Sequence, residues 1–313
     1  MSIRPLYGLR SIVWLALSVA ATSASAADPR PPISAVSHIA VYATDQAATE
    51  RFYVHDLGAT RGPDPEARSG RRYYFSASQF VEVLPLPSGA TSINRLDHVA
   101  FATADAAGLR RYLAAAGVHV PEAITTTPAE KWFEVQDPEG NRIQFLQTLT
   151  PPAITLSDRR ISDHIIHVGF IVHDRALEDG FYRKILGFRP YWFGGNENAK
   201  PTWISQQLPD GQDWLEYMLV DPPRGRGIPP GMSQTVLGIF NHFSLGVVNI
   251  ESVYTRLWNG ERLKDQDGVP KIGRDAKWQL NLHDPDGTRA EIMELHAIGK
   301  PCCSPFTAAD PSR

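Results

Sequence analysis

The sequence predicts an α+β protein built from four β-α-β-β-β units that are arranged in two halves. Three observations support this fold class: a strand pattern that occurs four times, a helix-like stretch after each copy, and extended segments that close each unit. The copies begin 60, 69 and 75 residues apart, which sets the length of the repeated unit. A chain of 313 residues is long enough for two domains of two units each.

Each copy of the strand opens with a histidine, and Asp or Asn follows seven positions later. The histidines are His38, His98, His167 and His242, and the residues that follow are Asp45, Asp105, Asp174 and Asn249. Large and small residues alternate between these positions, which is typical of a β-strand with two different faces. One face is apolar, whereas the other shows the histidine beside Ala, Gly or Ser. We expect the histidine face to line a cavity.

The segments after the strand are predicted from their turn and stop signals. The first and third units share Phe-Tyr followed by Leu-Gly at 57–58 and 186–187, and Gly after the last apolar residue ends a helix. The second and fourth units close with the sequence Asp-Pro-x-Gly at 137–140 and 284–287. Pro at the second position and Gly at the fourth favour a tight hairpin turn.

The N-terminus has the features of a secretory signal peptide. Arg4 and Arg10 precede a short apolar run, and an Ala-x-Ala cleavage site ends at Ala26. The run is too short to span a bilayer, and no later segment resembles a transmembrane helix. We therefore expect an exported protein, periplasmic or secreted, without membrane contact after cleavage. Removal of residues 1–26 leaves 29 basic and 34 acidic side chains, a net charge of −5 that gives no support for a nucleic-acid partner.

The domain boundaries follow from the repeat and from composition. We assign a signal peptide (1–26), a first half with units starting at His38 and His98 (27–150), a Pro-containing linker (151–160), a second half with units starting at His167 and His242 (161–297) and a tail (298–313). The tail carries the two cysteines, Cys302 and Cys303. Adjacent cysteines rarely bridge each other, so we expect them to be peripheral; the alternatives are a bridge or metal binding.

A carboxylate or carboxamide follows each histidine by 44 to 49 residues, near the end of each unit. These residues are Glu82, Gln144, Glu216 and Glu291. A constant separation indicates two ligands that meet at one point. Imidazole with carboxylate oxygens suits one divalent ion: Fe²⁺, Mn²⁺, Zn²⁺, Ni²⁺ or Co²⁺.

The second half has the complete ligand set, and we expect the metal there: His167, Glu216, His242 and Glu291. In the first half Gln144 replaces one carboxylate, and an uncharged amide is a poorer ligand. The residues His38, Glu82, His98 and Gln144 are therefore either a second metal site or a relic that only packs.

The His strands, the Phe-Tyr-x3-Leu-Gly helix ends and the Asp-Pro-x-Gly-x3-Glu/Gln hairpins resemble the vicinal oxygen chelate superfamily over residues 37–296. This superfamily includes glyoxalase I, extradiol dioxygenases and fosfomycin or bleomycin resistance proteins. The resemblance implies that each pair of units forms a curled mixed sheet around a concave cleft, with helices outside. It also implies a metal on His167, His242 and Glu291, with Glu216 as a fourth ligand or as the catalytic base.

Four units in one chain are most similar to extradiol dioxygenases, which implies an Fe²⁺- or Mn²⁺-dependent enzyme acting on a small molecule with vicinal oxygens. The chain departs from that pattern in three places. Asn281 stands where a Tyr is usual, the sequence at 272–274 lacks a usual His, and Glu216 replaces an acid-base His. We expect His164 and His173 to orient the metal ligands from behind.

Two alternatives remain open. A glyoxalase-like lyase or isomerase would use two His and two Glu, with Glu216 moving a proton beside a metal-bound carbonyl. Against it, the thiol cosubstrate of glyoxalase is cytosolic, whereas this protein has an export signal. A metal-free binding protein would instead use aromatic residues to stack a flat ligand, for which Trp192, Trp203 and Trp214 are candidates.

Overall fold

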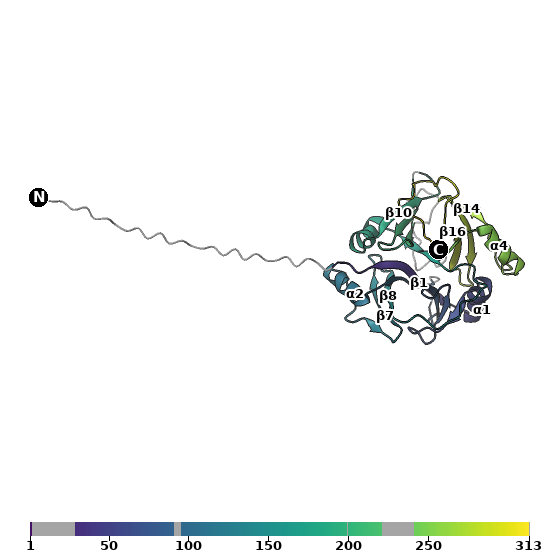
Figure 1. Cartoon of the computed structure of the whole chain (residues 1–313), viewed down its shortest axis with the longest axis horizontal. Coiled ribbons are helices and arrows are strands. Elements are labelled where there is room, and N and C mark those ends of the chain that lie inside the picture. The colour runs from purple at the N-terminus through teal and green to yellow at the C-terminus, as the bar shows by residue number, and fades with distance from the viewer. Residues whose placement is uncertain (2–28, 91–94, 199, 221–240, 313) are drawn as a thin grey trace.

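The computed structural model describes residues 29–90, 95–198, 200–220 and 241–312, so the expected signal peptide lies outside the described residues. The chain forms two eight-stranded sheets, one in each half, and Figure 1 shows the first half below the second. Each half contains two β-α-β-β-β units, which confirms the predicted fold class. Within the described residues, none of the helices combines the length and hydropathy needed to cross a bilayer.

The first half contains units one and two. Unit one consists of β1 (Ile33–Ala43), α1 (Gln46–Glu50), the π-helical segment η1 (Arg51–Asp56), β2 (Thr60–Gly62), β3 (Arg71–Tyr74) and β4 (Phe80–Pro85). Unit two consists of β5 (Leu96–Thr103), α2 (Ala106–Ala115), β6 (Thr125–Thr126), β7 (Glu130–Gln136) and β8 (Arg142–Thr148).

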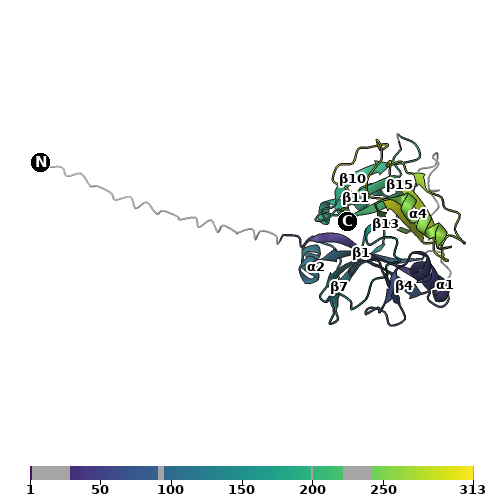
Figure 2. The ribbon, with the colours of Figure 1, turned by 45° about the vertical axis from the view of Figure 1, so that its right-hand side comes forward.

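The second half repeats this order. Unit three consists of β9 (Ile165–Val172), α3 (Arg175–Asp179), the π-helical segment η2 (Gly180–Ile185), β10 (Arg189–Gly194), β11 (Trp203–Gln207) and β12 (Trp214–Leu219). Unit four consists of β13 (His242–Val247), α4 (Ile250–Asn259), β14 (Lys271–Ile272), β15 (Trp278–His283) and β16 (Arg289–Glu294). Figure 2 shows α4 flanking the second sheet.

The sheets have the same strand order in both halves, β2-β3-β4-β1-β5-β8-β7-β6 and β10-β11-β12-β9-β13-β16-β15-β14. In every unit the last strand pairs in parallel with the first, and a parallel pair needs a crossover, which the helix and the hairpin supply. The two first strands of each half are antiparallel neighbours at the centre of the sheet. This order places the four ligand-bearing strands of each half side by side.

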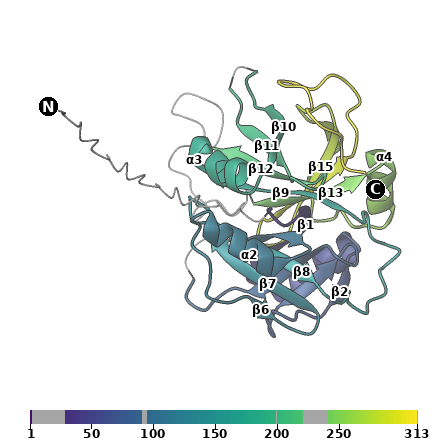
Figure 3. The ribbon, with the colours of Figure 1, turned by 60° about the vertical axis from the view of Figure 1, so that its left-hand side comes forward.

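The two faces of the His strands separate as the alternation predicted. Their large apolar residues belong to one hydrophobic core that extends through both halves, including Ile39, Phe101, Phe170 and Leu245. Helix α2 packs against β7 and β8 on this apolar side, and Figure 3 shows it in front of these strands. The histidines therefore lie on the opposite side of each sheet, away from the helices.

The residue seven positions after each histidine is the N-cap of the following helix. The side chains of Asp45, Asp105, Asp174 and Asn249 each accept a hydrogen bond from a backbone N–H of the first turn. Such side chains satisfy donors that the helix itself leaves unpaired. The repeated spacing thus marks the length of the first strand and the start of the helix.

The predicted stop and turn signals take the backbone conformations that favour glycine. Gly58 and Gly187 end the helical segments of units one and three at φ 76° and 81°, and Gly140 and Gly287 complete the two tight turns at φ 88° and 89°.

The two tight turns also connect the halves through hydrogen bonds. Tyr182 Oη of unit three donates to Asp137 Oδ2 at 3.0 Å, and Tyr53 Oη of unit one donates to Asp284 Oδ2 at 3.1 Å.

Candidate functional site

Four neighbouring strands of the second half bring the predicted ligands together. His167 is on β9, Glu216 on β12, His242 on β13 and Glu291 on β16. His167 Nε2 lies 3.2 Å from Glu291 Oε2, and His242 Nε2 lies 3.1 Å from Glu216 Oε2. One ligand atom from each of His167, Glu216 and His242 fits within 4.8 Å of the others. His167, Glu216 and His242 thus converge, and Glu291 contacts this group through His167.

Small residues beside the histidines make this approach feasible. Glu216 pairs in register with Gly169, and Glu291 pairs with Ser244. A Cβ atom at Gly169 would lie 2.1 Å from His242 Cε1, closer than any real contact. The Gly in the third strand copy is therefore required by the histidine of the fourth.

A cavity of about 530 Å³ opens above the second-half cluster. Glu216 and Glu291 line its floor, and the predicted aromatic residues Trp192, Trp203 and Trp214 line its walls. Trp214 also stacks on the His167 ring, with centroids 4.5 Å apart. His167 and His242 are fully buried below these groups. The cluster thus adjoins a pocket of small-molecule size.

The environment shifts the pKa values of the two carboxylates of the cluster in opposite directions. Burial raises the pKa of Glu216 above its usual value. Burial acts in the same sense on Glu291, but the hydrogen bond from His167 and the positive charge of Arg289 outweigh it and lower the pKa of Glu291 to about 2. Burial also lowers the pKa of His167, so its imidazole is neutral near pH 7. Neutral imidazole and ionised carboxylate are the forms that bind a metal.

Two titratable residues of the cavity wall were missed by the sequence analysis. Burial raises the pKa of Asp275 to about 7, although the backbone N–H of Lys277 donates to its side chain. Burial lowers the pKa of Lys277, whose Nζ donates to Asp310 Oδ1 at 2.8 Å. Both stand outside the repeated motifs, so neither the spacing nor the alternation could indicate them.

The tail contributes to this wall. The Phe306 ring lines the cavity and lies 5.0 Å from that of Tyr191, and Trp192 Nε1 donates to the carbonyl oxygen of Cys302. Cys302 and Cys303 are joined by a disulfide, which is the alternative that the sequence left open beside a peripheral role. The tail is therefore part of the pocket of the second half.

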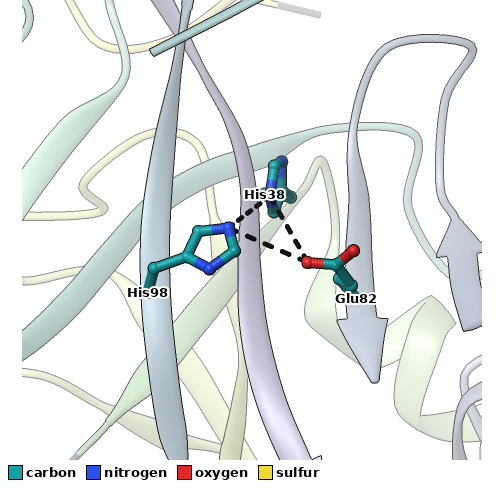
Figure 4. Close-up of side chains that lie close together, drawn as sticks. All are labelled: His38, Glu82 and His98. Carbon is teal, nitrogen blue, oxygen red and sulfur yellow. Dashed lines mark hydrogen bonds and ion pairs between the residues drawn. The ribbon is translucent and has the colours of Figure 1, made fainter. Parts of the chain in front are cut away.

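The first half holds an equivalent cluster, shown in Figure 4. His38 Nε2 and His98 Nε2 lie 2.9 Å apart, and Glu82 Oε2 lies 3.9 Å and 3.8 Å from them. None of the three side chains is more than 3% exposed. Gln144, the fourth predicted member, is fully buried, and its Nε2 donates to Glu66 Oε2 at 2.7 Å. His38, Glu82 and His98 therefore converge here too, and all four predicted residues are buried.

An arginine accounts for the difference between the halves. Arg72 on β3 pairs in register with Glu82, whereas Ser205 on β11 pairs with Glu216. The fully buried Arg72 guanidinium lies 4.2 Å from the Phe80 ring centroid and is ion-paired with Glu66 and Glu130. Ser205 instead lines the cavity of the second half. A long side chain thus occupies in one half the space that a short one leaves open in the other.

The structure gives His164 and His173 other partners than the expected metal ligands. His164 Nε2 lies 2.7 Å from Asp213 Oδ1, and the partly exposed His173 Nδ1 lies 2.9 Å from Glu139 Oε2. His164 directly precedes strand β9, and His173 directly follows it. These contacts give no support to the expected role of His164 and His173 in orienting His167 and His242, which stays a prediction.

The donor set of the second half fits a divalent metal ion. Two imidazoles and two carboxylates are hard-to-borderline ligands that suit the first-row metals and Zn²⁺. Among the described residues, His167 and His242 are the basic groups within ion-pair distance of Glu216 and Glu291, and Arg289 adds positive charge that acts to lower both pKa values. Burial of two carboxylates beside neutral imidazoles is costly unless a cation compensates their charge. Residues and geometry are thus consistent with the predicted cofactor class.

Comparisons with known proteins support the fold described above. A search of curated proteins found no match. Among solved structures, a catechol 2,3-dioxygenase is similar over 90% of this chain and 92% of its own, with 12% identity and a TM-score of 0.61. Homoprotocatechuate 2,3-dioxygenase from Brevibacterium fuscum, in complex with 3,4-dihydroxyphenylacetate, covers 85% and 81% at 17% identity and a TM-score of 0.60.

The Mn(II)-bound glyoxalase from Novosphingobium aromaticivorans is similar over 84% of this chain and 83% of its own, with 16% identity and a TM-score of 0.60. At these identities the likeness concerns the fold. The sequence profile of the Glyoxalase/Bleomycin resistance protein/Dioxygenase superfamily matches residues 35–145 and 164–292, which include all four His strands. The chain therefore belongs to the Glyoxalase/Bleomycin resistance protein/Dioxygenase superfamily.

Proposed function

We propose that the second half is a metal-dependent active site of the lyase or isomerase type, acting on a small molecule with two adjacent oxygens. One observation carries this proposal: both Glu216 and Glu291 contact the histidines at the floor of an open cavity. A divalent ion on these four residues would act as a Lewis acid for the substrate oxygens. Two carboxylates around one ion leave fewer positions for further ligands than the two-His-one-carboxylate set that the sequence first favoured.

The cavity walls supply groups that can hold the substrate. Trp214 Nε1 and Arg289 Nε are buried donors without a hydrogen-bond partner among the described residues. Both side chains line the cavity, so oxygens of a bound substrate can satisfy them. The indole faces of Trp192 and Trp203 offer flat apolar surface beside these donors.

Asp275 is a candidate for proton transfer. Its carboxyl group lines the same cavity as Glu216, and its pKa of about 7 lets it accept and return a proton near neutral pH. Glu216, whose pKa is also raised, is the second candidate base once it is released from the cluster. The separation in pKa between Glu216 and Glu291 assigns Glu291 the role of a permanently ionised anchor.

Dioxygenase chemistry is the second candidate. It is favoured by the likeness in fold to catechol 2,3-dioxygenase along almost the whole chain. In that reaction Glu216 would act as a base beside a three-residue metal site. A metal-free binding protein is less well supported, because a binder has no need of two buried carboxylates facing two buried histidines.

Metal content distinguishes these functions when it is measured by elemental mass spectrometry on the wild type and on Glu216→Gln. We expect the second half of the wild type to hold about one equivalent of metal per chain. The variant Glu216→Gln should lose this equivalent, because the amide is a weaker ligand. Iron or manganese that stays bound in the second half of the variant would support the dioxygenase. Absence of metal from the second half of both proteins, after loading, would contradict both enzymes and leave the binding protein.

We also infer that the protein acts outside the cytoplasm, because residues 1–26 have the pattern of a signal peptide. Intact-mass measurement on the protein from an extracytoplasmic fraction tests this. A mature chain that starts at Ala27 is the expected result, and a full-length chain confined to the cytoplasm would contradict export.

A further inference from the structure

The closed cluster of the first half has the features of a second, different metal site. His38, Glu82 and His98 come from β1, β4 and β5, and Figure 4 shows their side chains converging. Two atoms bound to one ion at about 2.0–2.1 Å lie roughly 3–3.5 Å apart. The observed separations of 2.9, 3.8 and 3.9 Å bracket this range, so small rotations bring all three atoms to one ion.

The outer nitrogens of both imidazoles already have partners. His98 Nδ1 lies 2.7 Å from Asp97 Oδ2, and Asp97 is held in turn by Tyr42 and by Arg142 Nη1. His38 Nδ1 lies 3.1 Å from Ser37 Oγ. A carboxylate or hydroxyl behind a ligating histidine fixes its tautomer and directs its other nitrogen to the metal. Both Nε2 atoms are thereby oriented toward the same point.

A fourth donor is present. Gln144 is fully buried, and its Nε2 is engaged by Glu66 Oε2. Its Oε1 has no hydrogen-bond partner among the described residues. Gln144 pairs in register with Ala100, the residue two positions after His98, as Glu291 pairs with Ser244. Gln144 thus occupies the position in the first half that Glu291 occupies in the second half.

The carboxylates around Arg72 outnumber the positive charge that this residue supplies. This single guanidinium has four carboxylates within ion-pair distance, which are Asp64, Glu66, Glu82 and Glu130. Burial of so many carboxylates is costly unless positive charge compensates them. A divalent ion on Glu82 would neutralise most of the excess.

We propose that His38, Glu82, His98 and Gln144 bind a divalent metal ion in a closed structural site, which stabilises the first half and takes no substrate. Four protein ligands without an open position are typical of structural zinc sites, and Zn²⁺ suits this mixture of imidazole and oxygen donors. Arg72 closes the site by filling the space that Ser205 leaves open in the second half. This inference does not depend on the reaction in the second half.

The two sites should differ in how readily a chelator removes their metal. We expect two equivalents in the purified full chain loaded with Zn²⁺, of which prolonged dialysis against EDTA removes one. Glu82→Gln should lose the retained equivalent and lower Tm, because an ion bound only by the folded state stabilises it. The matched variant Glu216→Gln should lose only the removable equivalent, which separates this proposal from that for the second half.

Arg72→Ser keeps all four ligands and provides a further test. It should convert the retained equivalent into one that EDTA removes, because the shorter side chain opens the site. A wild-type chain that retains no metal after EDTA, or that releases two equivalents at one rate, would overturn the proposal. Retention of the resistant equivalent in Glu82→Gln would also overturn it. The chelation experiment on the wild type decides the question even where a variant fails to fold.

Discussion

At the scale of single residues, small side chains determine whether the ligands can meet. Gly169→Ala places a Cβ atom 2.1 Å from His242 Cε1, so the imidazole must move away from Glu216. We expect metal affinity in the second half to fall by about 10- to 100-fold, as for other disturbances of ligand orientation. Titration with Zn²⁺ measures this loss.

Gly180→Ala is the matched control, since nothing lies within 4 Å of its added Cβ atom. Metal binding in this variant should equal that of the wild type. Equal affinities in Gly169→Ala and Gly180→Ala would contradict the role of Gly169.

Asp275 makes stability depend on pH. Burial raises its pKa in the folded state from 3.8 to about 7, so the folded protein holds the proton more tightly than the unfolded chain does. The carboxyl group therefore costs no stability below pH 3.8, and its cost grows as the pH rises to about 7. Asp275→Asn removes this cost while keeping an acceptor for the Lys277 N–H.

We expect the gain in stability of Asp275→Asn to increase between pH 4.5 and 8, to at most about 4 kcal/mol. Urea denaturation at several pH values measures this difference. The same variant should lose activity without losing metal, because Asp275 lies outside the ligand cluster. A stability difference that is independent of pH would contradict the buried, protonated carboxyl group.

At the scale of elements, strand register explains why one half is open and the other closed. Ser205→Arg on β11 would place a long cationic side chain opposite Glu216, as Arg72 lies opposite Glu82. We expect turnover to fall by about 100-fold or more, because the substrate loses its position above the cluster. Ser205→Ala should remain active, and a fully active Ser205→Arg would contradict this account of the cavity.

Register also shows how much the sequence could predict. Each repeat contains its own strand alternation, helix stop and hairpin, so the β-α-β-β-β units and the four ligand pairs were predictable from local patterns. The contacts that distinguish the halves depend on residues outside the repeat. Arg72, Ser205 and Asp275 lie at positions where the units differ, and only the paired strands show what faces them. The partners of His164 and His173, Asp213 and Glu139, were likewise not predictable from proximity in sequence.

At the scale of the whole molecule, the C-terminal tail completes the second half. Asp310 accepts a hydrogen bond from Lys277 Nζ, and Lys277 is fully buried, so the tail supplies the counter-charge for a cation in the cavity wall. The exposed fraction of the Asp310 side chain is 19%, which makes this pair weaker than a fully buried one. The pocket is therefore assembled from both the repeated units and the segment that follows them.

Two tyrosines connect the halves through equivalent contacts, which predicts a common unfolding transition. Tyr182 donates to Asp137 and Tyr53 donates to Asp284, each reaching from the helix of one half to the hairpin of the other. Tyr182→Phe and Tyr53→Phe each remove a buried donor, and we expect each to lower the free energy of unfolding by about 1–3 kcal/mol. Because each contact spans both halves, a single cooperative transition should shift in both variants when urea denaturation is followed by far-UV circular dichroism. Two separate transitions, with only one of them shifted, would show instead that the halves fold independently.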